Sequence, residues 1–179
     1  MRTPTITLIF AFLGGTWAFA QSGSAQKSEP PDTWRASTGD FAAMMVFTDE
    51  PQKFLEEWSK PPEAVPQISS VESAHRGDTV VAFVFFSGCK ANKGNCDCEV
   101  DFRLLRPDGS VYAEHSGVEL WKRKPPPPGG NLQLSVANLG FRVEPLDPLG
   151  KYNLKASVHD RNAKLDLLLE RKIEVLPAR

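Results

Sequence analysis

The stretch Cys96-Asp97-Cys98-Glu99-Val100-Asp101-Phe102-Arg103-Leu104 decides the fold class of this chain. Apolar or thiol side chains fall on every second residue, and charged side chains occupy the positions between them. Because successive side chains of a β-strand point to opposite faces, this pattern predicts a strand with one buried and one solvated face. Strands of this kind are typical of an antiparallel sheet that packs one face on a core.

Further strand-like segments precede and follow this stretch at short intervals. Gly- and Pro-rich turns separate them, and this spacing predicts a mainly-β antiparallel β-sandwich. The segment 79–86 is nearly all apolar, which predicts a central strand covered on both faces. The other expected strands are at 41–48, 68–74, 111–112, 118–121, 132–136, 141–143, 152–158 and 165–175.

One short helix is expected between the first two of these strands. Asp49-Glu50-Pro51 is typical of a helix start, and Lys60-Pro61-Pro62 is expected to end it. Phe54, Leu55 and Trp58 fall on one face of such a helix. We therefore expect the helix to lie on the sheet through Phe54 and Trp58.

A local motif near the C-terminus refines the fold. Asp147-Pro-Leu-Gly150-Lys-Tyr152 resembles the tyrosine corner of immunoglobulin-like sandwiches, in which Gly stands two residues before a Tyr that starts a late strand. The resemblance implies that the Tyr152 hydroxyl bonds to upstream backbone and fixes the turn formed with Asp147 and Gly150. The inter-sheet cysteine pair of antibody domains is missing, so the chain looks more like the immunoglobulin-like modules of secreted bacterial proteins. Residues 37–179 are expected to form this single domain.

The N-terminus carries the features of a cleavable secretory signal over residues 1–20. A positive charge at Arg2 is followed by an apolar run over 6–13, and Ala18-Phe19-Ala20 matches the small-x-small cleavage pattern. The run is shorter than the roughly 20 residues that a spanning helix needs, so no membrane span is expected. Residues 21–36 are polar and predict a disordered leader. The mature chain is expected in the periplasm or outside the cell.

The three cysteines, Cys89, Cys96 and Cys98, lie within ten residues of one another. In an exported chain a disulfide is the default expectation, and a hairpin over 90–95 lets Cys89 reach either Cys96 or Cys98. Cys96 is preferred because it is nearest the loop, which leaves Cys98 as a free thiol on the inward face. The alternative is a metal or redox site through Cys96 and Cys98, but the three histidines lie in separate segments and no metal is expected.

A prominent surface loop follows one of the shorter strands. Lys122, Arg123 and Lys124 precede four consecutive prolines, and Trp121 is expected to pack beneath the stiff loop that they form. Surface loops are where binding residues concentrate, so Trp121 to Lys124 are the first candidates for a partner contact.

Absent motifs and the charge balance restrict the function. The sequence contains no nucleophile elbow, phosphate loop, dinucleotide fingerprint or zinc-protease motif. Its formal net charge of −1 gives no attraction to nucleic acid. We therefore expect an exported, non-enzymatic binding or assembly module without a cofactor, whose partner is another envelope or extracellular protein. The alternative function is a periplasmic metal-binding or thiol-redox protein that uses Cys96 and Cys98.

Overall fold

The computed structural model describes residues 33–61 and 66–179. The expected signal segment and most of the expected leader lie outside the described residues. The elements are β1 (Arg35–Thr38), β2 (Phe41–Thr48), α1 (Pro51–Trp58), β3 (Ser73–His75), β4 (Thr79–Ser87), β5 (Asp97–Leu105), β6 (Val111–Lys122), a short 3-10 turn η1 (Pro128–Gly130), β7 (Gln133–Arg142), β8 (Gly150–Asp160) and β9 (Leu165–Leu176).

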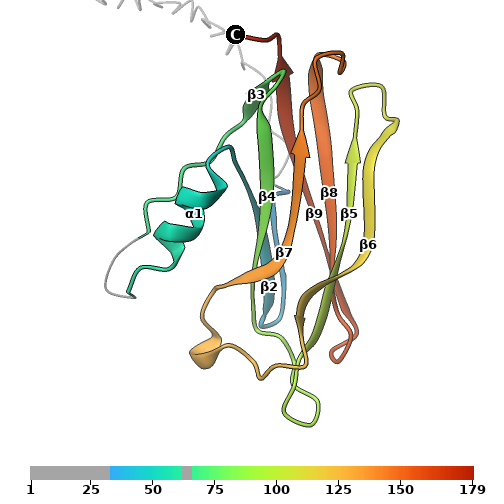
Figure 1. Cartoon of the computed structure of the whole chain (residues 1–179). Coiled ribbons are helices and arrows are strands. Elements are labelled where there is room, and N and C mark those ends of the chain that lie inside the picture. The colour runs from blue at the N-terminus through green and yellow to red at the C-terminus, as the bar shows by residue number, and fades with distance from the viewer. Residues whose placement is uncertain (1–32, 62–65) are drawn as a thin grey trace, which may run out of the picture.

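The strands form two packed sheets (Figure 1). One sheet has the order β1-β2-β4-β7 and the other has the order β3-β9-β8-β5-β6. The short β3 pairs parallel to β9, and the remaining strand pairs are antiparallel. The predicted fold class, a mainly-β antiparallel sandwich with one short helix, is therefore confirmed.

The strand order is that of an immunoglobulin-like sandwich. In that fold strands A, B and E share one sheet, strands C, F and G share the other, and variable-type domains add a further strand beside C. Here β2, β4 and β7 occupy the A, B and E places, while β5, β8 and β9 occupy the C, F and G places. The edge strand β6 is the addition beside C. The chain changes sheets between β2 and β3, and α1 lies in that crossover.

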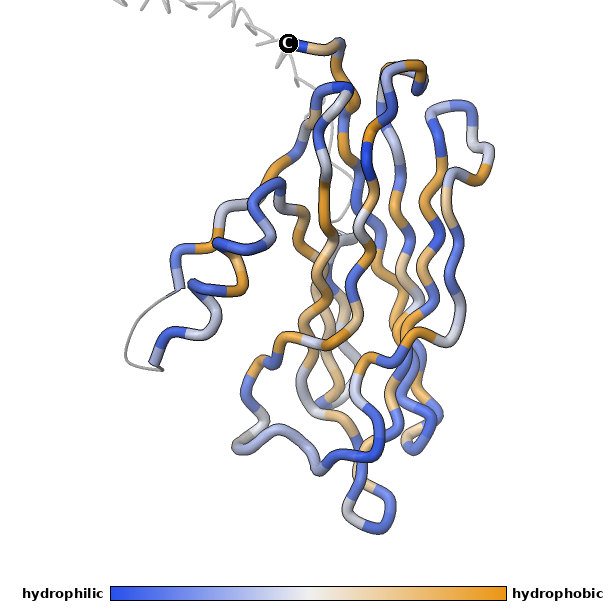
Figure 2. Tube along the Cα trace, viewed as in Figure 1, coloured by the Kyte–Doolittle hydropathy of each residue, from blue (hydrophilic) through white to orange (hydrophobic). Residues whose placement is uncertain are grey.

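The core lies between the two sheets. Figure 2 shows hydrophobic and hydrophilic residues alternating along several of their strands. Along β5 the burial alternates as the sequence predicts, with Cys98, Val100, Phe102 and Leu104 buried. Residues of the same parity on β8 complete the central layer: Tyr152, Leu154, Ala156 and Val158. The acidic row on β5, which consists of Asp97, Glu99 and Asp101, points away from this core.

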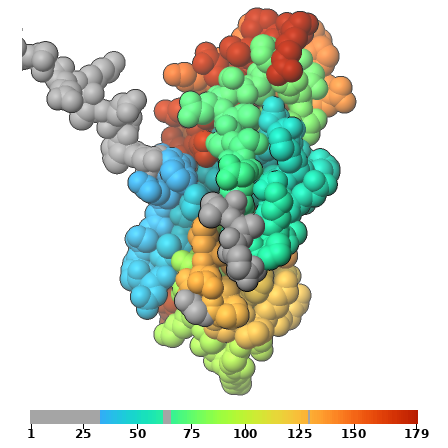
Figure 3. All heavy atoms as spheres, turned by 90° about the vertical axis from the view of Figure 1, so that its left-hand side faces the viewer, coloured from blue at the N-terminus to red at the C-terminus, as the bar shows by residue number. Residues whose placement is uncertain are grey.

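Helix α1 covers the outer face of the four-stranded sheet (Figures 1 and 3). The ring of Phe54 stacks on Phe83 at 4.4 Å, and Trp58 meets Phe85 edge-on at 4.9 Å. Thus β4 is covered on both faces, and the helix contacts the sheet through Phe54 and Trp58, as expected. Leu55, in contrast, is 44% exposed and lies at the margin of the packed face.

Several boundaries differ from the sequence-based expectations. Strand β1 begins inside the expected leader, because Arg35 pairs with Met44 at the edge of the sheet. The expected strands 111–112 and 118–121 are parts of one strand, β6, whose middle is exposed and polar and therefore lacks a hydropathy signal. The expected strands 132–136 and 141–143 likewise belong to β7 and the single residues that flank it. Of the expected strand 68–74, only Ser73 and Ala74 belong to a strand, β3.

Candidate functional site

Three loops meet at one end of the sandwich, which we call the loop end and define as residues 88–97, 121–132 and 160–165 (Figure 1). The strand registers bring them together, because Asp97 pairs with Lys122 and Cys98 pairs with Asp160. The β4–β5 connection projects furthest from the body of the molecule (Figures 1 and 3). The loop end therefore contains both of the expected features, the cysteine cluster and the residues Trp121 to Lys124.

The β4–β5 connection is a cross-linked hairpin. Cys89 and Cys96 form a disulfide with a Cα–Cα distance of 6.0 Å, the pairing that the sequence favours. Between them Asn92 and Asn95 exchange backbone hydrogen bonds of 2.9 and 3.1 Å around Lys93 and Gly94. Both central residues have positive φ, as type I′ turns require. Closing so short a loop reduces the entropy of the unfolded chain and contributes about 2.5 kcal/mol.

The β8–β9 turn is hydrogen-bonded to this hairpin. Asp160 is 1% exposed, and its carboxylate accepts the backbone N–H of Lys90 at 2.7 Å and those of two residues in its own turn, Asn162 and Ala163. The Asn162 side chain donates to the carbonyls of Lys90 and Asn95, both at 3.0 Å. Because a buried acceptor is costly unless it is satisfied, these bonds fix the two loops relative to each other.

The β6–β7 connection is attached to the same hairpin by backbone bonds. The N–H of Cys96 donates to the Lys124 carbonyl at 2.8 Å, and the N–H of Arg123 donates to the Cys96 carbonyl at 3.1 Å. Trp121 packs on Phe86 and donates its indole N–H to the Pro125 carbonyl at 2.9 Å. The Lys124 ammonium lies over the Trp121 ring at 4.8 Å. As expected, Trp121 supports the proline-rich loop.

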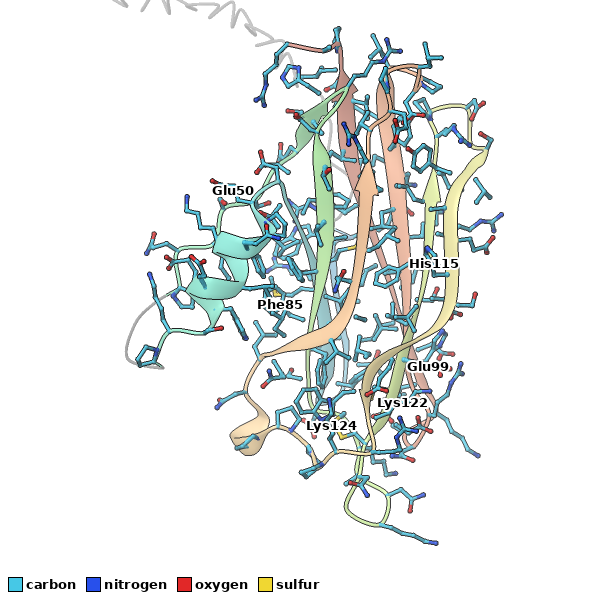
Figure 4. All side chains as sticks on the ribbon, viewed as in Figure 1. Glu50, Phe85, Glu99, His115, Lys122 and Lys124 are labelled. Carbon is cyan, nitrogen blue, oxygen red and sulfur yellow. A yellow bond between two sulfur atoms is a disulfide. The ribbon has the colours of Figure 1, made fainter. Side chains whose placement is uncertain are left out.

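An ion-pair cluster lies on the outer face of β5 beside the loop end (Figure 4). The Glu99 carboxylate accepts from the Lys122 ammonium at 2.5 Å and from the Arg161 guanidinium, with Nε at 2.6 Å. These hydrogen bonds hold the pKa of Glu99 below its ordinary value and raise the pKa values of Lys122 and Arg161. A second cluster joins His159 to Asp166 at 2.6 Å and to Asp101 at 3.3 Å. Asp97 and Glu99 are therefore paired with cationic side chains of β6 and of the β8–β9 turn, and Asp101 faces His159 of β8.

Positive charge is concentrated at the loop end. Its three segments contain seven Lys and Arg residues and two Asp residues, although the whole chain has a net charge of −1. Glu99 pairs with both Lys122 and Arg161, so its single negative charge offsets one of their two positive charges. Arg123 approaches Glu119 only at 3.5 Å, and its side chain is 87% exposed. An open pocket of about 450 Å³ lies here, lined by the cations Lys93, Lys122 and Arg123 and by the amides Asn92, Asn95 and Asn162.

Cys98 is a fully buried thiol next to the disulfide in sequence. Burial, together with the nearby carboxylates of Asp160 and Asp97, raises the pKa of Cys98 to about 12. A reactive cysteine needs the opposite environment, exposed and electropositive. Because Cys96 is bonded to Cys89, the pair Cys96 and Cys98 does not supply the two thiolates of the alternative site. Within residues 33–61 and 66–179 no cluster of His, Cys, Asp and Glu is placed to hold a metal ion.

The expected tyrosine corner is wrong in one respect. Tyr152 does lie near the start of β8, but its hydroxyl is buried and has no hydrogen-bond partner among the residues that the structure describes. The Tyr112 hydroxyl takes the corner role instead, lying 2.8 Å from both the Asp147 carboxylate and the Arg142 carbonyl. Its single proton serves one acceptor at a time. Burial and the Asp147 carboxylate raise the pKa of Tyr112 to about 12.

Sequence reasoning missed the two side chains that hold the loop end together, Asp160 and Asn162. A signal was present for Asp160, because it continues the buried parity of β8 after Ala156 and Val158. A polar residue at a buried position requires internal hydrogen-bond partners. Nothing in the sequence marks Asn162, whose partners are 67 and 72 residues away.

Comparisons with known proteins give no family. No family model matches the chain, and no curated protein matches it. Among solved structures, a Niemann-Pick type C2 protein from Japanese carpenter ant is 11% identical with a TM-score of 0.39, covering 74% of this chain and 89% of that one. A family 123 glycoside hydrolase from Clostridium perfringens is 7% identical with a TM-score of 0.38, covering 78% of this chain and only 28% of the hydrolase chain. Likenesses this weak carry no functional argument.

Among the described elements, no helix has the length and hydropathy needed to cross a bilayer.

Proposed function

We propose that this protein is an exported, non-enzymatic binding module that contacts its partner through the loop end. The observation that carries the proposal is the set of hydrogen bonds that joins the three loops. A surface that is ordered before binding loses little conformational freedom when a partner arrives. Loops held rigid on a sandwich are also where binding residues concentrate in this architecture.

The position of the loops within the fold supports the same proposal. In immunoglobulin variable domains, the loop between strands B and C and the loop between strands F and G lie at the binding end of the sandwich. The β4–β5 and β8–β9 connections occupy these two places here. This support is an analogy at the level of fold, and the charges and contacts of the loop end provide the site-level argument.

The disulfide supports the location that the proposal assigns. Cross-links such as Cys89–Cys96 form and persist in oxidising compartments, including the periplasm and the extracellular space. The partner is then a component of the envelope or the extracellular medium. Two observations disfavour the thiol-redox alternative. Cys98 is buried and inaccessible, and Cys96 is already oxidised in the disulfide with Cys89.

Photo-crosslinking in the source organism tests the proposal. A photoreactive residue replaces Lys93 at the loop end in one full-length chain and Lys151, at the opposite end of β8, in another. We expect adducts from position 93 and none from position 151. Adducts from position 151 alone, or no adduct from position 93, would contradict the proposed surface. Turnover in a broad hydrolase screen that is lost on a single substitution would contradict the non-enzymatic assignment.

A further inference from the structure

We infer that the ligand of the loop end is an acidic glycan, a sugar polymer that carries carboxylate or sulfate groups. This inference rests on the proposed function and names the chemical class of the ligand. It starts from the separation of charge in this chain. The loop end has an excess of five positive charges. Because the net charge of the whole chain is −1, the remainder of the chain has an excess of negative charge. Charge gathered at one end of a molecule attracts and orients an oppositely charged ligand.

The cations at the loop end remain available for a ligand. Lys93 lies at the tip of the hairpin and is exposed, and Arg123 projects its side chain with 87% exposure. Lys164 is exposed in the β8–β9 turn. Lys93, Arg123 and Lys164 are also the three non-glycine residues with positive φ in the described part of the chain. Positive φ is uncommon for such residues. The backbone of Lys93 is held by the Asn92–Asn95 bonds and that of Arg123 by its bond to the Cys96 carbonyl.

The lining of the pocket indicates a hydrophilic ligand. Beside the cations it presents the amides of Asn92, Asn95 and Asn162, whose groups donate and accept hydrogen bonds. The Asn162 amide nitrogen is already used within the loop end, which leaves its oxygen as an acceptor. Amides suit the hydroxyl groups of a sugar, and the ammonium and guanidinium groups suit its anionic substituents. Asp97 is the acidic group of the lining, and Lys122 lies 3.6 Å from it.

The same lining argues against a protein partner, which the sequence led us to expect. Protein interfaces have a buried centre rich in aromatic residues and Met, and they are depleted in Lys. No aromatic residue lines this pocket, and the nearby Trp121 is half-buried beneath Lys124 and bonded to Pro125. An open, polar and cationic surface is therefore better matched to a hydrated acidic polymer.

Equilibrium binding of the mature chain to defined polymers tests this inference. The probes are polygalacturonate and heparin as carboxylated and sulfated glycans, dextran as a neutral glycan, and polyglutamate as an acidic polypeptide. We expect binding to at least one acidic glycan that weakens with added salt, with no binding to dextran and weaker binding to polyglutamate. Comparison of the two glycans identifies which anionic substituent is preferred.

Matched variants locate the binding site. The double substitution Lys93→Glu and Arg123→Glu should weaken binding roughly a hundredfold, about tenfold for each charge-assisted contact. Lys151→Glu with Lys172→Glu makes the same change of charge at exposed positions away from the loop end and should weaken binding less than about threefold. Asn92→Ala, which changes no charge, should weaken glycan binding, whereas attraction by charge alone would leave it unaltered.

The outcomes separate this inference from the proposed function. Binding to polyglutamate as tight as to either glycan, or equal losses in the two double variants, would overturn the glycan assignment. Absence of binding to both acidic glycans would also overturn it. In each of these cases adducts from position 93 would still support the loop end as the binding surface, whereas the absence of those adducts would overturn the proposed function itself.

Discussion

At the scale of single residues, Tyr112 and Tyr152 provide a direct contrast. Their rings meet at 5.6 Å at the end of the sandwich opposite the loop end. Tyr112→Phe removes the hydroxyl that bonds Asp147 or Arg142 and should lower the free energy of unfolding by about 1–2 kcal/mol. Tyr152→Phe removes a buried hydroxyl without a partner and should leave that free energy unchanged or raise it by up to about 1 kcal/mol. Urea unfolding measures the free energy of unfolding of both variants. A larger loss for Tyr152→Phe than for Tyr112→Phe would indicate that Tyr152 forms the tyrosine corner.

A second residue-scale prediction concerns Cys98. Because burial raises the pKa of the Cys98 thiol to about 12, almost no thiolate is present at pH 8 and the folded chain should not react with a thiol reagent. Unfolding without a reductant should expose one thiol per chain, and reduction should expose three. The unfolded Cys98→Ser variant should expose no thiol before reduction. Rapid labelling of the folded chain, or a thiol in unfolded Cys98→Ser, would contradict the assignment of the cysteines.

The cysteines and the tyrosines show which residue contacts a sequence discloses. Cys89 and Cys96 are seven residues apart across a turn, so local geometry was sufficient to favour their pairing. Tyr112 on β6 and Asp147 in the β7–β8 connection are 35 residues apart, and no local pattern connects them. The corner motif predicted the correct loop but the wrong hydroxyl, because which tyrosine reaches Asp147 depends on how β6 packs on β7, where Tyr112 contacts Phe141 and the Arg142 carbonyl.

At the scale of elements, the attachment of α1 depends on one face of a short helix. Phe54 is 3% exposed and stacks on Phe83, so Phe54→Ala should lower the free energy of unfolding by about 3 kcal/mol. Leu55→Ala, in the same turn but with an exposed side chain, should change it by less than about 1 kcal/mol. Equal effects of the two substitutions in urea unfolding would contradict the packing of α1 on β4.

The ion-pair cluster joins β5, β6 and the turn after β8, and it should make stability depend on pH. Hydrogen bonds from Lys122 and Arg161 lower the pKa of Glu99 from 4.5, so the folded state binds this proton less readily than the unfolded state. The stabilisation is therefore present above pH 4.5 and is lost as the pH falls through the lowered pKa. Glu99→Gln should lower the free energy of unfolding by about 1 kcal/mol at neutral pH and by progressively less below pH 4.5.

Glu114→Gln is the matched control for this cluster. Glu114 lies on β6 and faces Arg103 at 4.0 Å with both side chains more than half exposed, so its removal should be nearly neutral at every pH. Thermal unfolding across the acidic range measures both variants. A Glu99→Gln cost that persists unchanged in acid would contradict the role of the carboxylate.

The elements themselves were predictable where burial imposes a period on the sequence. Strands β2, β4, β5, β8 and β9 have a buried face, and their bounds agree with the sequence to within a few residues. Strand β6 is an edge strand whose middle, Glu114 to Gly117, is exposed, so alternation stops there although the strand continues. Strand β1 is short and pairs on one side only, which leaves almost no pattern in its four residues.

At the scale of the whole molecule, the candidate site is assembled from three segments that are far apart in sequence. The sequence identified two of its parts, the cysteine hairpin and the loop that begins at Lys122, as separate features. Their meeting depends on the registers that place Lys122 and Asp160 beside the start of β5. The third part, the β8–β9 turn, could not be assigned a role from sequence because its contacts are all long-range.

Lysine footprinting of the native protein is the most direct test of the loop end as a binding surface. Lysines are distributed over both ends of the sandwich, with Lys90, Lys93 and Lys164 at the loop end and Lys151 and Lys172 away from it. An amine-reactive reagent is applied to the protein in the native envelope or secreted fraction, and again after purification. We expect protection of the loop-end lysines in the native fraction only, with equal labelling of Lys151 and Lys172 in both. Protection confined to Lys151 and Lys172, or identical labelling of the loop-end lysines in both samples, would contradict a binding surface at the loop end.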